Sequence, residues 1–222
     1  MNIKFIAQSG FILEDGNERL CIDLWLNNPV NTIKIEEVPT MNYVFVTHDH
    51  KDHDMQTGIE IAKRDNAIFF ANVDITKLAS QKGVQKVERQ NIGGTIISGN
   101  IEVAQVKAEH NSDTGIPIGF IIKFANHTIY HMGDTGYFKG LDVLSEIYNI
   151  DILMVPIGSR YTMDSIEASY VVKDIKPKLV IPMHYNTSVH IQQNPEIFKS
   201  LTLSKYPLTN VAIMKPGETI VI

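Results

Sequence analysis

A run of alternating histidines and aspartates constrains this chain more than any other feature of its sequence. The short apolar segment 43–46, which predicts a buried strand, is directly followed by Thr47-His48-Asp49-His50-Lys51-Asp52-His53. His48 and His50 are two residues apart, so on an extended loop both side chains can point to the same side. Because the chain holds only 8 histidines in 222 residues, this clustering favours a metal site over a solvated polar loop.

Three further predicted strands end next to side chains that can bind metal. Strand 101–108 is followed by Glu109-His110, strand 128–131 leads to Asp134, and strand 179–182 leads to His184. A lone histidine is more often a structural residue, so none of these positions is informative by itself. Functional groups do collect where strands end in layered sheets, because the loops there are free of ladder hydrogen bonds. Together with the histidine run, the three positions predict one shared site.

The number of available ligands suggests two metal ions. Asp134 has two carboxylate oxygens and can bridge both ions, and each ion then keeps an open position, as a catalytic site requires. A structural zinc site would close its shell, usually with cysteines, and the chain has only Cys21. The expected ligands are His48, His50 and His110 for one ion, Asp52, His53 and His184 for the other, and Asp134 for both.

Composition narrows the class of protein and the compartment. The chain has 20 Lys and Arg against 25 Asp and Glu, a net charge of −5, so nucleic acid is an unfavoured partner. Cys21 lies in an apolar run and is expected to pack in a core, which suits a reducing compartment, the cytoplasm. No apolar run approaches the ~20 residues of a membrane helix. The expected partner is a small-molecule substrate, and a homo-oligomer stays open.

The pattern of apolar residues predicts one α/β domain over residues 1–222, since no linker or low-complexity segment divides it. Strand-rich and helix–strand stretches occur in both halves, which indicates two sheets stacked face to face with helices outside, an αββα sandwich. The predicted helices are 54–64, 73–82, 139–148, 164–175 and a helical turn near 195–201. The predicted strands are 3–7, 10–14, 19–24, 43–46, 68–70, 86–90, 95–98, 101–108, 118–124, 128–131, 152–155, 179–182, 211–214 and 219–222.

The order of these residues resembles the metallo-β-lactamase superfamily. The resemblance is carried by His48-x-His50-x-Asp52-His53 followed by His110, Asp134 and His184, and it extends over essentially the whole chain. Further segments are similar to a branch of bacterial and archaeal metal-dependent hydrolases of unassigned substrate, related to the L-ascorbate-6-phosphate lactonases. These segments are Ala71-Asn72, Gly83-Val84, Gly93-Gly94-Thr95, Gly133-Asp134-Thr135-Gly136, Pro156-Ile157-Gly158, Tyr161-Thr162-Met163 and Ile181-Pro182-Met183-His184-Tyr185-Asn186-Thr187.

The resemblance implies the αββα metallo-β-lactamase fold with a dinuclear site between the sheet edges. The expected activity is hydrolysis of a small ester, lactone or phosphoester by a water that the metals activate. Asp52 and Asp134 are the expected catalytic residues, and Asp52 either binds metal alone or also receives a proton. His131 is expected to orient a ligand. Arg160, Tyr161 and Asn186 fall in loops that the resemblance places around the cleft, where an Arg could hold a carboxylate or phosphate.

Zinc is the expected metal, because imidazole nitrogens suit it, while the two carboxylates leave manganese, iron and cobalt open. Two other functions stay open at this point. One is a non-hydrolytic metal-binding protein, either a sensor or a redox protein. The other is a phosphodiesterase or nuclease of the same superfamily, which the acidic composition disfavours.

Overall fold

The computed structural model describes residues 1–31 and 33–222. Contacts divide the chain into two compact units. The first unit is Met1–Asn91 with Asn111–Ile118 and Lys215–Ile222, and the second is Ile92–His110 with Gly119–Met214. The single domain expected from the sequence stays a prediction.

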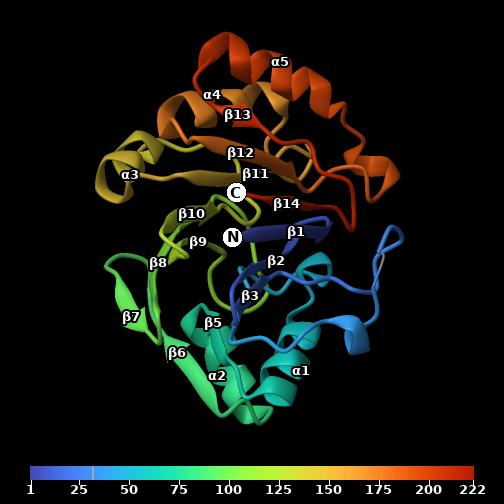
Figure 1. Ribbon diagram of the computed structural model, residues 1–222, viewed down its shortest axis with the longest axis vertical. Coiled ribbons are helices and arrows are strands. Elements are labelled where there is room, and N and C mark those ends of the chain that lie inside the picture. Colours follow the sequence, from blue (N-terminus) through green and yellow to red (C-terminus); the bar gives the residue numbers. More distant parts are fainter. Residues whose placement is uncertain (32) are drawn as a thin grey trace. The chain divides into compact units, whose positions relative to one another are not determined.

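The first unit holds a seven-stranded mixed sheet in the order β14-β1-β2-β3-β4-β5-β6, coloured mostly blue to green in Figure 1. The pairs from β14 to β3 are antiparallel, and the pairs from β3 to β6 are parallel. The strands are β1 (Asn2–Ala7), β2 (Gly10–Asp15), β3 (Glu18–Ile22), β4 (Tyr43–Phe45), β5 (Ile68–Ala71), β6 (Lys86–Arg89) and β14 (Thr219–Val221).

Two helices, α1 (Met55–Asp65) and α2 (Val73–Gln81), pack on this sheet. Each begins at a capping side chain: Asp54 accepts a hydrogen bond from the backbone N–H of Thr57, and Asn72 accepts one from that of Ile75. The apolar faces of the helices and the sheet form one buried cluster that includes Val44, Ile59, Ile61, Phe69, Ile75 and Ala79. This unit also contains two short 3-10 helices, η1 (Ile35–Glu37) and η2 (Lys51–His53). Part of the histidine run lies on η2.

The second unit holds another seven-stranded sheet, in the order β13-β12-β11-β10-β9-β8-β7. The pairs from β10 to β13 are parallel, whereas β9 with β10 and β7 with β8 are antiparallel. The strands are β7 (Ile96–Ser98), β8 (Ile101–Lys107), β9 (Ile118–Phe124), β10 (His127–His131), β11 (Ile152–Pro156), β12 (Leu179–Met183) and β13 (Asn210–Val211).

Its helices are α3 (Leu141–Tyr148), α4 (Ser165–Ile175) and α5 (Pro195–Lys205), with a short η3 (Val189–Ile191). Figure 1 shows α4 and α5 side by side, in agreement with their many contacts. Asp164 caps α4 by accepting from the N–H groups of Ile166 and Glu167, and Asn194 caps α5 ahead of Pro195 at the first turn. A second buried cluster joins these helices to the sheet and includes Tyr130, Leu153, Val155, Val171, Val180 and Phe198.

The predicted elements are found with their ends moved by a few residues, with one clear exception. The strand expected at 211–214 is wrong in its extent, because β13 covers Asn210 and Val211 and one further backbone hydrogen bond, from Ala212 to Val180, follows it. The helical turn expected near 195–201 continues to Lys205. Among the described residues, no helix is both long enough and apolar enough to cross a bilayer.

Candidate metal centre

Ligand-type side chains of the first unit gather where its parallel strands end. β3 and β4 run parallel with Ile22 opposite Phe45, so Asp23 and the Thr47-His48 pair leave the sheet at the same edge. The backbone confirms this placement, since the N–H of Asp23 donates to the carbonyl of Phe45 at 3.0 Å. The carboxyl ends of parallel strands are the usual location of binding groups in such sheets.

The carboxylate of Asp23 organises this edge. Its Oδ1 accepts from the Thr47 backbone N–H at 2.9 Å, and its Oδ2 accepts from the Thr47 hydroxyl at 2.7 Å. The same Oδ2 lies 2.7 Å from Nδ1 of His53. All three side chains are buried. Because a carboxylate can only accept, Nδ1 of His53 carries the proton, and Nε2 then presents the lone pair that a metal needs.

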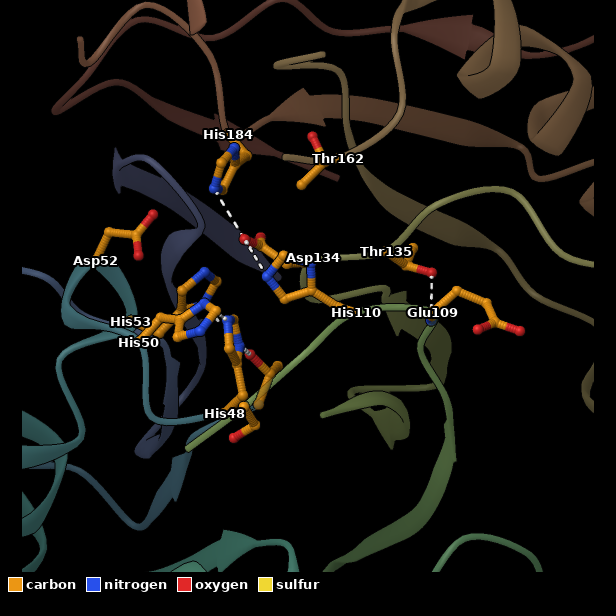
Figure 2. Close-up of polar contacts among 12 residues, drawn as sticks. His48, His50, Asp52, His53, Glu109, His110, Asp134, Thr135, Thr162 and His184 are labelled. Carbon is orange, nitrogen blue, oxygen red and sulfur yellow. Dashed lines mark hydrogen bonds and ion pairs between the residues drawn. The ribbon is translucent and has the colours of Figure 1, made fainter. Parts of the chain in front are cut away.

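His48 is oriented in a similar way by Thr47. The Thr47 hydroxyl gives its proton to Asp23, so at 3.1 Å it accepts from Nδ1 of His48. Nε2 of His48 then faces Nδ1 of His50 at 3.1 Å, as Figure 2 shows. Two nitrogen ligands of a tetrahedral zinc ion, each 2.0–2.1 Å from the metal, are about 3.3 Å apart. The spacing of these two nitrogens therefore suits a shared cation.

Asp52 and His53 lie together on η2, and each offers a ligand atom within 4.8 Å of the other. Asp52 is half-buried, and its Oδ2 accepts a hydrogen bond from the side-chain amide of Gln8 at 2.8 Å. Asp49, between the first two histidines, is used differently: its Oδ1 accepts from the Ser112 hydroxyl at 2.8 Å. Partial burial acts to raise the pKa of Asp49, but hydrogen bonds from Thr114, Ser112 and nearby backbone outweigh it and lower that pKa.

In the second unit, Asp134 is the centre of a group of three ligand-type side chains. Its Oδ2 lies 3.0 Å from Nε2 of His184 and 3.6 Å from Nε2 of His110, the contacts drawn as dashed lines in Figure 2. Asp134 and His184 are buried, and the His110 side chain is 9% exposed. Two imidazole nitrogens thus converge on one carboxylate oxygen at separations that a bound cation could span.

Backbone hydrogen bonds fix the loops that carry Asp134 and His110. The Thr135 hydroxyl accepts from the N–H of Glu109 at 2.9 Å and donates to the carbonyl of Gly136 at 2.7 Å. The N–H of Gly136 returns a hydrogen bond to the carbonyl of Glu109 at 3.0 Å. The two loops, which follow β8 and β10, are therefore joined one residue away from each ligand. His131, expected to orient a ligand, accepts from the N–H of Gly133 at 3.2 Å and braces the turn before Asp134.

The loop after β11 lies against His184. A Cβ atom added at Gly158 would be 2.2 Å from the His184 carbonyl oxygen, so only glycine fits there. The N–H of Met163 donates to the Thr135 carbonyl at 3.2 Å, which ties the other end of this loop beside Asp134. The exposed tip between these two anchors carries Arg160, whose guanidinium lies 5.4 Å from the ring centroid of Tyr161.

Two residues that follow His184 serve the local structure. The side-chain amide of Asn186 makes two hydrogen bonds to the backbone of Gln193. Its Oδ1 accepts from the Gln193 N–H at 2.8 Å, and its Nδ2 donates to the Gln193 carbonyl at 3.0 Å. A substrate contact of Asn186 stays a prediction. Burial, with a smaller contribution from Glu196, raises the pKa of Tyr185 to about 12, so its hydroxyl is protonated at neutral pH.

The sequence reasoning missed Asp23, Thr47, Gln8 and Thr135. Asp23 did leave a signal, because it is a carboxylate inside the apolar run 19–24 and such a group needs a buried partner. Thr47 and Thr135 each adjoin a predicted ligand, yet threonine is common in loops. Nothing in the sequence distinguishes Gln8 from an ordinary turn residue.

The residues present fit a metal ion by their chemistry. Each unit offers imidazole nitrogens and carboxylate oxygens, which together suit zinc and other divalent transition ions. The histidines His48 and His53 are held in the tautomer that leaves Nε2 available. The predicted assignment of seven ligands stays a prediction at this point.

Comparisons with known proteins agree with this chemistry. The family described as the beta-lactamase superfamily domain matches residues 2–184. A metal-dependent hydrolase of Staphylothermus marinus is 41% identical over 224 residues, covering 98% of this chain and 97% of its own length. One of Pyrobaculum islandicum is 38% identical over 225 residues, covering 99% of both chains. Igni18, a metallo hydrolase from Ignicoccus hospitalis, superposes with a TM-score of 0.91 at 34% identity, covering 99% of this chain and 98% of its own.

The mixed α/β fold, with its two sheets and their helices, is thus that of the beta-lactamase superfamily, and the expected fold class is confirmed. Within that superfamily the chain belongs to the family of the metal-dependent hydrolases.

Proposed function

We propose that the chain hydrolyses a small ester, lactone or phosphoester, with seven side chains as the ligands of two divalent metal ions. The relatives named as metal-dependent hydrolases support the reaction class, and the chemistry of the side chains supports the ligands. The proposed ligands of one ion are His48, His50 and His110, those of the other are Asp52, His53 and His184, and Asp134 serves both.

A single observation carries the proposal: one oxygen of Asp134 is approached by Nε2 of both His184 and His110, at 3.0 Å and 3.6 Å. A buried carboxylate between two imidazoles is suited to bridging cations, because it can offer an oxygen to each. The hydrogen bonds through Thr135 hold the loop that carries Asp134 in place before any ion arrives. Prearranged ligands lose little freedom on binding.

The bound ions would supply a water of lowered pKa and a positive charge for the oxygen under attack. The chain's own residues fix where this happens. Asp23 and Thr47 hold His53 and His48 with Nε2 outward, and Asp52 either binds metal alone or also takes the proton of the attacking water. Zinc is the proposed metal, with manganese, iron or cobalt as alternatives.

The loop between Gly158 and Met163 supports a role in substrate binding for Arg160 and Tyr161. This loop is anchored to His184 at one end and to Thr135, next to Asp134, at the other, so both ends of the loop lie close to proposed ligands. A guanidinium at such a place would bind a carboxylate or phosphate group of the substrate. The proposed substrate is therefore a small anion. The proposed compartment is the cytoplasm, which the buried free thiol of Cys21 suits.

The test combines metal analysis with a panel of substrates. The purified chain should contain two metal ions and hydrolyse at least one of an aryl ester, a lactone, a phosphomonoester and a phosphodiester. The variant Asp134→Ala should lose metal and turnover together, whereas Asp142→Ala, at an exposed position of α3, should lose neither. Two bound ions without turnover on the whole panel would instead favour a sensor or redox protein, and turnover of the phosphodiester alone would favour a phosphodiesterase.

A further inference from the structure

Gln8 occupies an unusual position for a glutamine. It lies in the tight turn between β1 and β2, where residues are commonly exposed, yet it is only 2% exposed. Its φ of 56° lies in the left-handed region, which Gly, Asn and Asp adopt at least cost. A turn alone would favour one of those residues, so the long amide side chain of Gln8 is explained by what it contacts.

The turn that carries Gln8 packs against the ligand-bearing edge of the first unit. Two residues along the chain, Gly10 approaches the backbone so closely that a Cβ there would be 3.0 Å from the Asp23 carbonyl oxygen. Asp23 in turn holds Nδ1 of His53. The hairpin end is therefore fixed relative to the residues that orient the histidines, and Gln8 projects from a rigid support.

The side chain of Gln8 reaches Asp52 across 44 positions of sequence, donating from Nε2 to Oδ2 at 2.8 Å. Asp52 lies on the three-residue η2, where its side chain is half-buried. An amide donor restricts the rotation of that carboxylate without adding charge. A lysine or arginine in place of Gln8 would compete with a metal cation for Asp52, and a carboxylate there would repel the Asp52 carboxylate.

We propose that Gln8 is a positioning residue for Asp52, fixing the carboxylate so that it can serve one of two metal ions. This inference rests on the proposed function, in which Asp52 is a metal ligand. It goes beyond that function by assigning a role to a residue outside the ligand set. Outer residues that hydrogen-bond to a ligand typically change metal affinity by about 10–100-fold.

The test uses variants that keep the backbone demand of the turn. Gln8→Met retains side-chain length and the left-handed position but removes the donor. Gln8→His restores an N–H donor, and histidine tolerates left-handed backbone well. Thr76→Val, at a fully buried position of α2, is the control for the loss of a buried polar atom. The affinities for two Zn²⁺ ions are measured by competition with a chromophoric chelator, and thermal unfolding is measured in excess chelator.

We expect Gln8→Met to weaken one Zn²⁺ affinity by about 10-fold or more and to leave the other unchanged. Gln8→His should recover most of the loss, and Thr76→Val should match the parent. The inference is overturned if Gln8→Met binds both ions as the parent does. It is also overturned if both affinities fall equally alongside a lower unfolding temperature in chelator, because that pattern marks a purely structural role.

A further variant separates this inference from the proposed function. If Asp52→Ala binds both Zn²⁺ ions like the parent, the ligand assignment fails and the role of Gln8 falls with it. If Gln8→Met selectively weakens one ion while the parent hydrolyses nothing on the substrate panel, the hydrolase proposal fails and the positioning role stands.

Discussion

Oδ2 of Asp23 lies 2.7 Å from Nδ1 of His53, and both side chains are fully buried in the first unit. The pair links the end of β3 to η2, 30 residues further along the chain. A buried carboxylate that accepts from an imidazole fixes both the ring orientation and the tautomer. The histidine run alone therefore does not define a metal site, because the protonation of its rings depends on a residue outside the run.

We predict that Asp23→Asn weakens metal binding more than it weakens the fold. The asparagine amide can place an N–H toward Nδ1 of His53, which moves the ring proton to Nε2 and removes the lone pair that would bind metal. We expect a loss of about 10–100-fold in the affinity for one ion, measured by chelator competition. The ¹⁵N shifts of the histidine rings would report the tautomer directly.

A matched control for that substitution is Asp65→Asn. Asp65 is also a buried carboxylate of the first unit, and it accepts from the backbone N–H of Met41 at 2.8 Å. It should lose stability without loss of metal affinity. Equal metal affinities for Asp23→Asn and the parent would show that Asp23 does not set the tautomer of His53.

We predict that Thr135→Val uncouples the loops that carry Asp134 and His110. Valine has nearly the shape of threonine but cannot accept from the N–H of Glu109, which is left without its 2.9 Å hydrogen bond. Loss of such a contact costs about 1–3 kcal/mol, to be measured by urea unfolding in chelator. Metal content should fall as well. Thr128→Val, at another buried threonine of the second unit, should keep full metal content, and identical metal content in both variants would contradict the prediction.

We predict that Gly158→Ala lowers both the free energy of unfolding and the metal content, although it adds a single methyl group. That group would lie 2.2 Å from the His184 carbonyl oxygen, so the loop or the backbone of His184 must move. Overpacking of this kind costs about 1–3 kcal/mol, and here it also displaces a proposed ligand. The contrasting variant is Gly136→Ala, whose new Cβ would meet its nearest neighbour at an ordinary 3.8 Å. Unfolding and metal content of the two variants should differ clearly, and similar values would refute the argument.

The layered α/β fold could be predicted from the sequence because its core strands are short apolar runs separated by clear turns. Segments such as 118–124 are apolar apart from Gly119 and Lys123, and the helices begin at capping residues such as Asp164. The strand expected at 211–214 failed because the register with β12 covers only Asn210 and Val211, although β12 itself continues to Met183. Pairing partners are not encoded in local periodicity.

The proposed ligands were visible because histidine clusters are rare, whereas the residues that orient them were not. Asp23 and Gln8 act on residues 30 and 44 positions away. Such pairs depend on strand order and turn geometry, which a single sequence does not give. The tautomer of His53 is a tertiary property of this kind.

We predict that Asp151 stabilises the second unit in a pH-dependent way. It joins the starts of β10 and β12, accepting from the Thr128 N–H at 2.9 Å and pairing with Lys178 at 2.7 Å. Partial burial acts to raise the pKa of Asp151, but these contacts outweigh it and lower that pKa. A lowered carboxyl pKa contributes stability above the ordinary pKa of about 4, and this stability is lost as the pH falls through the folded value.

Asp151→Asn should therefore be less stable than the parent at pH 6, and the difference should shrink as the pH is lowered below about 4. Urea unfolding of both proteins in chelator at a series of pH values measures this difference directly. The comparison of parent with variant cancels the titration of groups that do not interact with Asp151, whereas the charge of His127, which also lowers this pKa, is part of the measured difference. A difference that stays constant from pH 6 to pH 3 would show that the charge of Asp151 contributes nothing.

We predict that Arg160→Gln discriminates between charged and neutral substrates. Arg160 and its neighbour Ser159 both have left-handed backbone, with φ of 44° and 61°, a conformation that the surrounding loop must hold in place. A matched pair of p-nitrophenyl esters, the neutral acetate and the negatively charged hemiglutarate, tests the role of the guanidinium. The variant should lose about 10-fold in kcat/KM for the charged ester, mainly through KM, because it removes a charge-assisted hydrogen bond. The neutral ester should be unaffected. Arg160→Lys keeps the charge but not the bidentate geometry, so its kcat/KM for the charged ester should lie between those of the parent and of Arg160→Gln. Equal losses on both esters would assign Arg160 to loop structure rather than to substrate binding.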